Sequence, residues 1–128
     1  MGLQDCSVGA TVPVTDMATA KEFYEGKLGL SGGTERGDGG VSYDCEGGTR
    51  IHVYPSPDNA GKSGATLAAF QTNDVEGVVD ELVSSGVSFE HYDSGEIKTN
   101  EKGIAELGDV KGAWFKDPDG NTLAIANP

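Results

Sequence analysis

The sequence predicts an α+β protein built from two similar modules, each with the element order strand, helix and three strands. Its 128 residues are the length of one domain with a substantial core. The same order of strand, helix-capping and turn signals occurs twice along the chain, which fixes the expected architecture. The 20 glycines favour short strands and many turns over a helical bundle.

The first module is predicted at residues 5–55. Residues 7–14 form its first strand, and Asp16 is a typical N-cap for a helix. The apolar spacing of residues 18–27 is that of an amphipathic helix, which Gly29 ends. Three short strands complete the module, at residues 30–35, 40–45 and 50–54.

Residues 56–64 are rich in proline and glycine and have no apolar period, so they are predicted to link the modules. The second module, at residues 65–128, repeats the pattern. Asp74 caps its helix and Gly86 ends it. Its strands are predicted at residues 65–71, 87–92, 110–116 and 121–126. The polar segment 93–109 is predicted as a long loop, which either covers a cleft or is an ordered surface excursion.

The last two strands are joined by Asp117-Pro118-Asp119-Gly120-Asn121, a strong turn signal. Pro118 presets its φ angle at the first corner, and Asp117 can accept hydrogen bonds from the backbone that follows. The final hairpin is therefore the best-defined feature of the sequence.

Composition excludes several partners. The formal net charge is −12, whereas binding to nucleic acid or an anionic membrane needs a basic surface. No apolar run is long enough to span a membrane, and no signal peptide follows Met1, so we expect a cytoplasmic protein. Cys6 and Cys45 have no metal-type spacing and are expected to be buried or idle thiols in a reducing compartment.

Three blocks of residues resemble a known family. They are residues 12–17 with Phe23-Tyr24 and Leu28-Gly29-Leu30, residues 74–82 with Gly86-Val87, and residues 114–121. With these blocks the chain resembles the vicinal-oxygen-chelate superfamily, which includes glyoxalase I, bleomycin-resistance proteins and extradiol dioxygenases. The resemblance covers nearly the whole chain, 1–128. It implies paired βαβββ modules in a U-shaped mixed sheet around a small-molecule cleft, with the helices outside, often in a homodimer.

In metal-dependent members of that family, four strands each supply one metal ligand. The resemblance places these positions at Gly9, His52, Leu67 and Ala124. Only His52 has a side chain that can bind a metal, whereas a divalent ion needs three or four N, O or S ligands. We therefore expect no metal and no other cofactor.

Alternation along residues 50–54 puts Arg50, His52 and Tyr54 on one face of a strand. His52 is interpreted as a ligand contact, as a general base, or as a solvated histidine without a role in binding. Trp114 is expected either to face the cleft, because the resemblance places Phe115 under a helix, or to pack at the junction of the two modules. The candidate ligand-binding residues are His52, Tyr54, Arg50, Trp114, Gly9, Leu67, Ala124 and Glu90.

The expected function is metal-independent binding of a small organic ligand, in the manner of a drug- or metabolite-sequestering protein. An alternative is a lyase, isomerase or dioxygenase of the same superfamily, either metal-free with His52 as the base or with a non-standard metal site. A third is a scaffold with a vestigial cleft. The sequence leaves open whether the chain is an enzyme, and whether the cleft forms within one chain or across a dimer.

Overall fold

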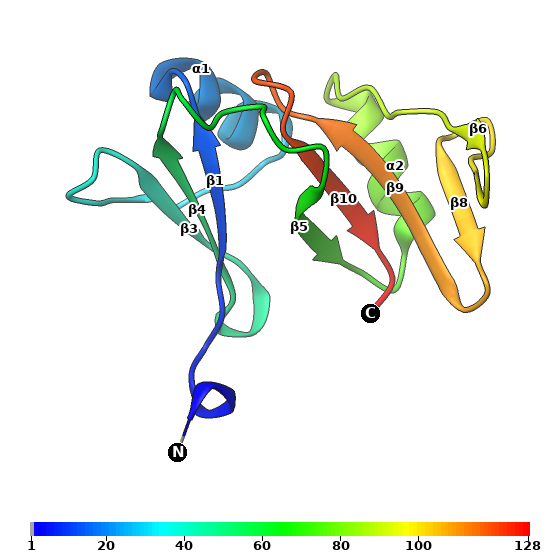
Figure 1. Ribbon diagram of the computed structural model, residues 1–128, viewed down its shortest axis with the longest axis horizontal. Helices are drawn as coiled ribbons and strands as arrows, with labels where there is room; N and C mark the ends of the chain where they lie inside the picture. Colours follow the sequence, from blue (N-terminus) through cyan, green and yellow to red (C-terminus); the bar gives the residue numbers. More distant parts are fainter. Residues whose placement is uncertain (1) are drawn as a thin grey trace.

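A computed structural model describes residues 2–128 and contains two four-stranded mixed sheets side by side, with two main helical segments (Figure 1). The α+β class and the two-module architecture predicted from the sequence are confirmed. Strands β1 and β5 are the edge strands that lie nearest each other, and no hydrogen-bonded ladder joins the two sheets.

The first sheet has the strand order β1-β4-β3-β2, in which β1 is parallel to β4 and the other pairs are antiparallel. Its strands are β1 (Ala10–Val14), β2 (Thr34–Glu35), β3 (Val41–Asp44) and β4 (Arg50–Pro55). The helix between β1 and β2 begins as α1 (Met17–Lys21) and continues as the π-helical η2 (Glu22–Lys27). Short 3-10 turns are η1 (Leu3–Asp5) and η3 (Glu46–Gly48).

The second sheet repeats this topology with the order β5-β10-β9-β8, and β5 is parallel to β10. Its elements are β5 (Thr66–Gln71), α2 (Val75–Ser84), β8 (Ile104–Leu107), β9 (Val110–Lys116) and β10 (Thr122–Ala126). A separate small hairpin consists of β6 (Asp93–Ser94) and β7 (Ile97–Lys98). Both predicted N-caps are present, because Asp16 accepts from the N–H of Ala18 and Asp74 from that of Gly77.

Two sequence predictions about strands were wrong. Residues 87–92 form no strand; only Phe89 makes an isolated bridge, to Phe115. The missing strand is β8, which lies inside the segment predicted as a loop. Val87 and Phe89 are apolar because they pack into the core, whereas half of β8 is exposed at a sheet edge and therefore has a weak apolar pattern. The strand predicted at 30–35 is reduced to β2.

One apolar core joins the two modules on the sides of the sheets that face the helices. The rings of Phe23 from η2 and Phe115 from β9 are 6.3 Å apart, and Phe89 packs against Phe115. On β4, Ile51 and Val53 are buried in this core, so the residues between them face the opposite side of the sheet. A single core means that the modules stabilise each other.

The turn of the final hairpin fixes the modules together through polar contacts. The buried Asp117 carboxylate accepts from the Tyr24 hydroxyl at 2.8 Å and from the Asn121 side chain at 2.9 Å. Asn121 also donates to the carbonyl of Pro13 in β1, at 2.7 Å. Burial, and then the negative charge of Asp117, raise the pKa of Tyr24, so its hydroxyl remains a donor.

Candidate functional site

Four of the predicted residues lie together on the open face of the first sheet. Arg50, His52 and Tyr54 alternate along β4 with the buried residues of the core. Gly9 directly precedes β1, and a Cβ atom placed on it would be 3.3 Å from the carbonyl oxygen of Arg50. We call Gly9, Arg50, His52 and Tyr54 the first group.

The imidazole of His52 is held by two side chains that sequence reasoning missed. Its Nδ1 is 2.9 Å from the Ser42 hydroxyl, and its Nε2 is 2.7 Å from a carboxylate oxygen of Asp38. Ser42 is opposite His52 in the β3–β4 pairing, and its hydroxyl accepts from Nε of Arg36 at 3.2 Å. Only the strand register reveals Ser42, and only the path of the β2–β3 loop brings Asp38 and Arg36 to the ring.

The donors and acceptors in this network have one consistent arrangement for a neutral imidazole. The hydrogen bond from His52, followed by that from the backbone N–H of Gly40, lowers the pKa of Asp38, so its carboxylate only accepts. Nε2 of His52 then carries the hydrogen, and Nδ1 accepts from the Ser42 hydroxyl. Both ring nitrogens are therefore engaged, and the ring is fixed in orientation.

Tyr54 adds a second ring to this face. The rings of His52 and Tyr54 are parallel within 3°, with centroids 5.8 Å apart. Both side chains are only partly buried. The first group thus offers aromatic faces, while the polar edge of His52 is occupied by protein groups.

The other predicted residues belong to the second sheet. Trp114 on β9 is directly opposite Ala124 on β10, and Leu67 is on the neighbouring strand β5. The Tyr92 ring meets Trp114 edge to face, with centroids 5.8 Å apart and an interplanar angle of 75°. Glu90 is joined to Trp114 through a backbone hydrogen bond of 2.8 Å. We call Leu67, Glu90, Trp114 and Ala124 the second group.

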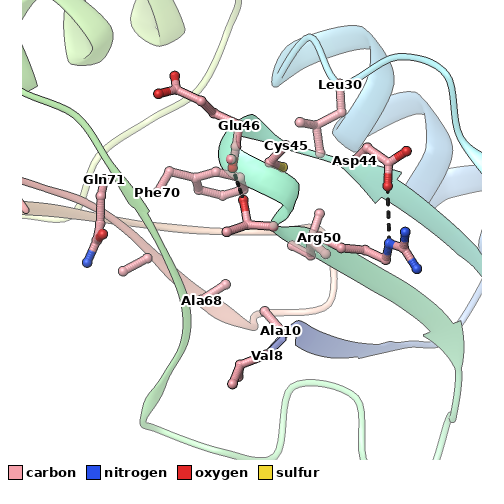
Figure 2. A pocket seen from close by; sticks show the side chains of 14 residues that line it. Val8, Ala10, Leu30, Asp44, Cys45, Glu46, Arg50, Ala68, Phe70 and Gln71 are labelled. Atoms are coloured by element: carbon pink, nitrogen blue, oxygen red, sulfur yellow. Dashed lines mark hydrogen bonds and ion pairs between the residues drawn. The ribbon is translucent and has the colours of Figure 1, made fainter. Parts of the chain in front are cut away.

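The two groups lie on different sheets. A cavity of about 600 Å³ lies between the modules, and of the eight residues in the two groups only Arg50 lines it (Figure 2). One chain therefore does not bring all eight predicted residues around that cavity. Tyr43 on β3 is buried in the core and donates to Glu25 at 2.6 Å.

The four positions of the metal-binding pattern do not fit a divalent ion. Gly9, Leu67 and Ala124 have no donor side chain, and both nitrogens of His52 already have protein partners. Across residues 2–128, no group of three or more His, Cys, Asp and Glu side chains is arranged to hold a metal. The donor set at these positions is therefore unsuitable for metal binding.

Comparison with known families gives one match over most of the chain. Residues 8–125 match the model of the Glyoxalase/Bleomycin resistance protein/Dioxygenase superfamily. Among curated proteins, none matches this sequence.

Solved structures share the fold at low sequence identity. A glyoxalase/bleomycin resistance protein from Catenulispora acidiphila is 22% identical, with a TM-score of 0.65 over 95% of this chain and 97% of the other. One from Streptomyces sp. CB03234 is 22% identical, with a TM-score of 0.64 over 94% and 98%. TnmS3, an antibiotic binding protein from the same Streptomyces, is 21% identical, with a TM-score of 0.60 over 96% and 95%.

Proposed function

Because the chain belongs to the Glyoxalase/Bleomycin resistance protein/Dioxygenase superfamily, we propose that it binds a small organic molecule without the help of a metal ion. The observation that carries this proposal is the state of the four family metal positions. Three of them lack a donor, and the fourth, His52, has both nitrogens engaged by Ser42 and Asp38. Binding then depends on shape and aromatic contacts.

The chemistry of the two groups favours a flat, aromatic ligand. The first group contributes the parallel rings of His52 and Tyr54, and the second contributes Trp114 beside Tyr92. Aromatic side chains stack on planar ligands. Ala124, the residue paired with Trp114 on the neighbouring strand, has a small side chain. The fold of an antibiotic binding protein, TnmS3, is compatible with this use of the scaffold.

We propose that the complete cleft forms in a homodimer. In one chain the two groups lie on separate sheets; in the proposed dimer, the first group of one copy opposes the second group of another. Size-exclusion chromatography with light scattering should give twice the chain mass. A monomer that binds ligand with full affinity would contradict this arrangement.

The proposed compartment is the cytoplasm. Residues 2–128 contain no helix that is both long and apolar enough to cross a membrane. Cys6 and Cys45 are free thiols, as is usual in a reducing compartment.

Two measurements on the purified protein test the function. Elemental analysis should find far less than one transition metal per chain. A screen of planar aromatic compounds should give saturable quenching of Trp114, the single tryptophan. A tightly bound stoichiometric metal, or no quenching by any compound, would contradict the proposal.

A pair of variants then tests the position of the ligand. Ala124→Leu places a larger side chain beside Trp114 and should weaken binding at least about tenfold, because the added atoms crowd the ring on which the ligand is proposed to stack. The matched control is Ala18→Leu, the same change at an exposed helix position. Equal affinity in the two variants would place the ligand elsewhere.

One observation favours a second function, that of a metal-free lyase or isomerase. The Ser42–His52–Asp38 chain orients the imidazole as an acid–base group would be oriented. Under this alternative, His52→Ala abolishes turnover of a bound compound, whereas a sequestering protein shows no turnover to lose.

A further inference from the structure

The cavity of about 600 Å³ lies apart from the aromatic groups described above, between the edge strands β1 and β5 (Figure 2). Ala68 and Phe70 of β5 line one side, and Ala10 of β1 lines the other. Its volume is within the range of sites for small organic ligands. The lining residues used in the argument below are Leu30, Asp44, Cys45, Glu46, Arg50 and Phe70.

The walls of this cavity are apolar and its rim is charged. Leu30, Ile51 and Phe70 supply the apolar wall. At the rim, Arg50 is paired with Asp44 through a hydrogen bond of 3.1 Å, which neutralises its charge locally. Glu46 is exposed at the same rim, and no side chain of residues 2–128 pairs with its carboxylate. The rim therefore has one uncompensated negative charge.

A second, smaller cavity of about 120 Å³ adjoins the first, because Leu30 and Phe70 line both. Its other lining residues are also apolar: Leu28, Val78, Leu82, Phe115 and Ile125. Apolar cavities of about 150 Å³ in protein cores bind benzene. The small cavity is thus suited to a ring or short alkyl chain that passes between Leu30 and Phe70.

We propose that these two cavities form a second binding site, for an organic amine whose apolar tail enters the small cavity and whose cationic group lies at Glu46. The tail exchanges water for the apolar walls, and the ammonium meets the uncompensated carboxylate. The net charge of −12 also favours a cation over an anion. Desolvation by burial, and then Asp44, raise the pKa of the Cys45 thiol, which therefore serves as a neutral wall atom.

Apart from Arg50, which lies at the rim and also belongs to the first group, this site shares no residue with the proposed aromatic cleft. Its tail-binding residues face the helices and the core, whereas His52, Tyr54 and Trp114 are on the other side of the sheets. It is complete in one chain, so dimer formation is not needed for it. Either site can fail without the other.

Three probes with one tail and different head charges test the site: 3-phenylpropylamine, 3-phenylpropanol and 3-phenylpropanoate. Each is titrated into the ¹⁵N-labelled full chain and followed by NMR. We expect the amine to shift the amides of Leu30, Glu46 and Phe70, and to bind about fivefold more tightly than the alcohol, the scale of a partly exposed ion pair. The carboxylate should bind most weakly.

Two variants with matched controls distinguish the contribution of the probe's apolar tail to binding from that of its charged group. Ala68→Leu narrows the cavity and should weaken binding of all three probes, whereas Ala18→Leu on the exposed helix surface should not. Glu46→Gln should remove the fivefold preference for the amine and leave the alcohol unchanged, whereas Asp58→Asn removes an exposed charge elsewhere and should have no effect. Because Glu46 is exposed, its variant keeps the fold even if Ala68→Leu does not.

The results divide clearly. Amide shifts at Glu46 and Phe70, with a preference for the amine that Glu46→Gln removes, support the site. Equal affinity for the three probes, shifts confined to His52 and Trp114, or no saturable shifts would overturn it. If the aromatic groups were found to bind no ligand, the titrations of the three probes at the second site would not be affected. The two proposals can therefore fail separately.

Discussion

Asp117 has the densest set of polar contacts in the final turn. One oxygen of its carboxylate accepts from the backbone N–H groups of Asp119 and Asn121, and the other from Tyr24 and the Asn121 side chain. Because Asp117 is 5% exposed, water cannot replace these partners. A residue that the sequence marks as a turn former thus also connects η2 to the last hairpin.

Replacement of Asp117 by alanine should lower the free energy of unfolding by about 3–5 kcal/mol, since several buried donors lose their acceptor at once. Urea denaturation followed by circular dichroism measures the change. Asp58→Ala, an exposed turn position, is the control and should change stability by less than about 0.5 kcal/mol. A loss at Asp117 no larger than that of the control would show that the contacts contribute little.

The Asp38–His52 pair should make stability depend on acidic pH. The pKa of Asp38 is lowered in the folded state from its ordinary value of 3.8, chiefly by the hydrogen bond from His52. A lowered pKa stabilises the fold above pH 3.8, and this contribution is lost as the pH falls through the folded-state pKa. The melting temperatures of the wild type and Asp38→Asn should therefore differ at pH 5 and converge near pH 2. A difference that stays constant would exclude this linkage.

At the scale of elements, burial rather than the alternation of apolar residues determined which segments of the second module became strands. The apolar residues Val87 and Phe89 alternate with polar ones, as in a strand. Their side chains are buried in the core, but the segment forms no hydrogen-bonded strand and only Phe89 makes an isolated bridge. Strand β8 has only two buried residues, Ile104 and Ala105, and pairs with β9 along an exposed edge. A short edge strand with one buried half has no reliable period in its sequence.

The linker between the modules provides a matched test with two glycines. Gly61 has a φ of 69°, and a Cβ atom there would overlap the backbone carbonyl of Asp119. Gly64 has open space around it and no positive φ. Gly61→Ala should therefore destabilise the protein by about 2 kcal/mol or more, whereas Gly64→Ala should be neutral or slightly stabilising. Thermal unfolding of both variants provides the comparison, and equal midpoints would contradict the close packing of the linker on the final turn.

At the scale of the whole molecule, the charge of −12 is spread over a single domain with few compensating cations. Lysines form ion pairs such as Lys111–Glu76 and Lys102–Asp80. The chain has only nine lysines and arginines for 21 acidic residues, so there are too few basic side chains to pair with them all. Most carboxylates must therefore repel one another across the surface.

Salt should consequently stabilise the fold. Raising KCl from 0.05 to 1 M is expected to increase the melting temperature by several degrees, because screening reduces repulsion between exposed carboxylates. Differential scanning calorimetry at neutral pH measures the shift. Glucose at equal osmolality controls for solvent effects, and a melting temperature that falls with KCl would contradict the expectation.

The sequence by itself determined the two-module α+β fold, both helix N-caps and the final turn, because these depend on local backbone preferences and short apolar periods. It also indicated that Arg50, His52 and Tyr54 share a face, which follows from the alternation of a strand. Only the tertiary structure decided that Ser42 and Asp38 hold His52, that the aromatic residues divide between two sheets, and that Asp117 joins η2 to the last hairpin. Those contacts link residues far apart in the chain or depend on strand register and loop path, which no local pattern encodes.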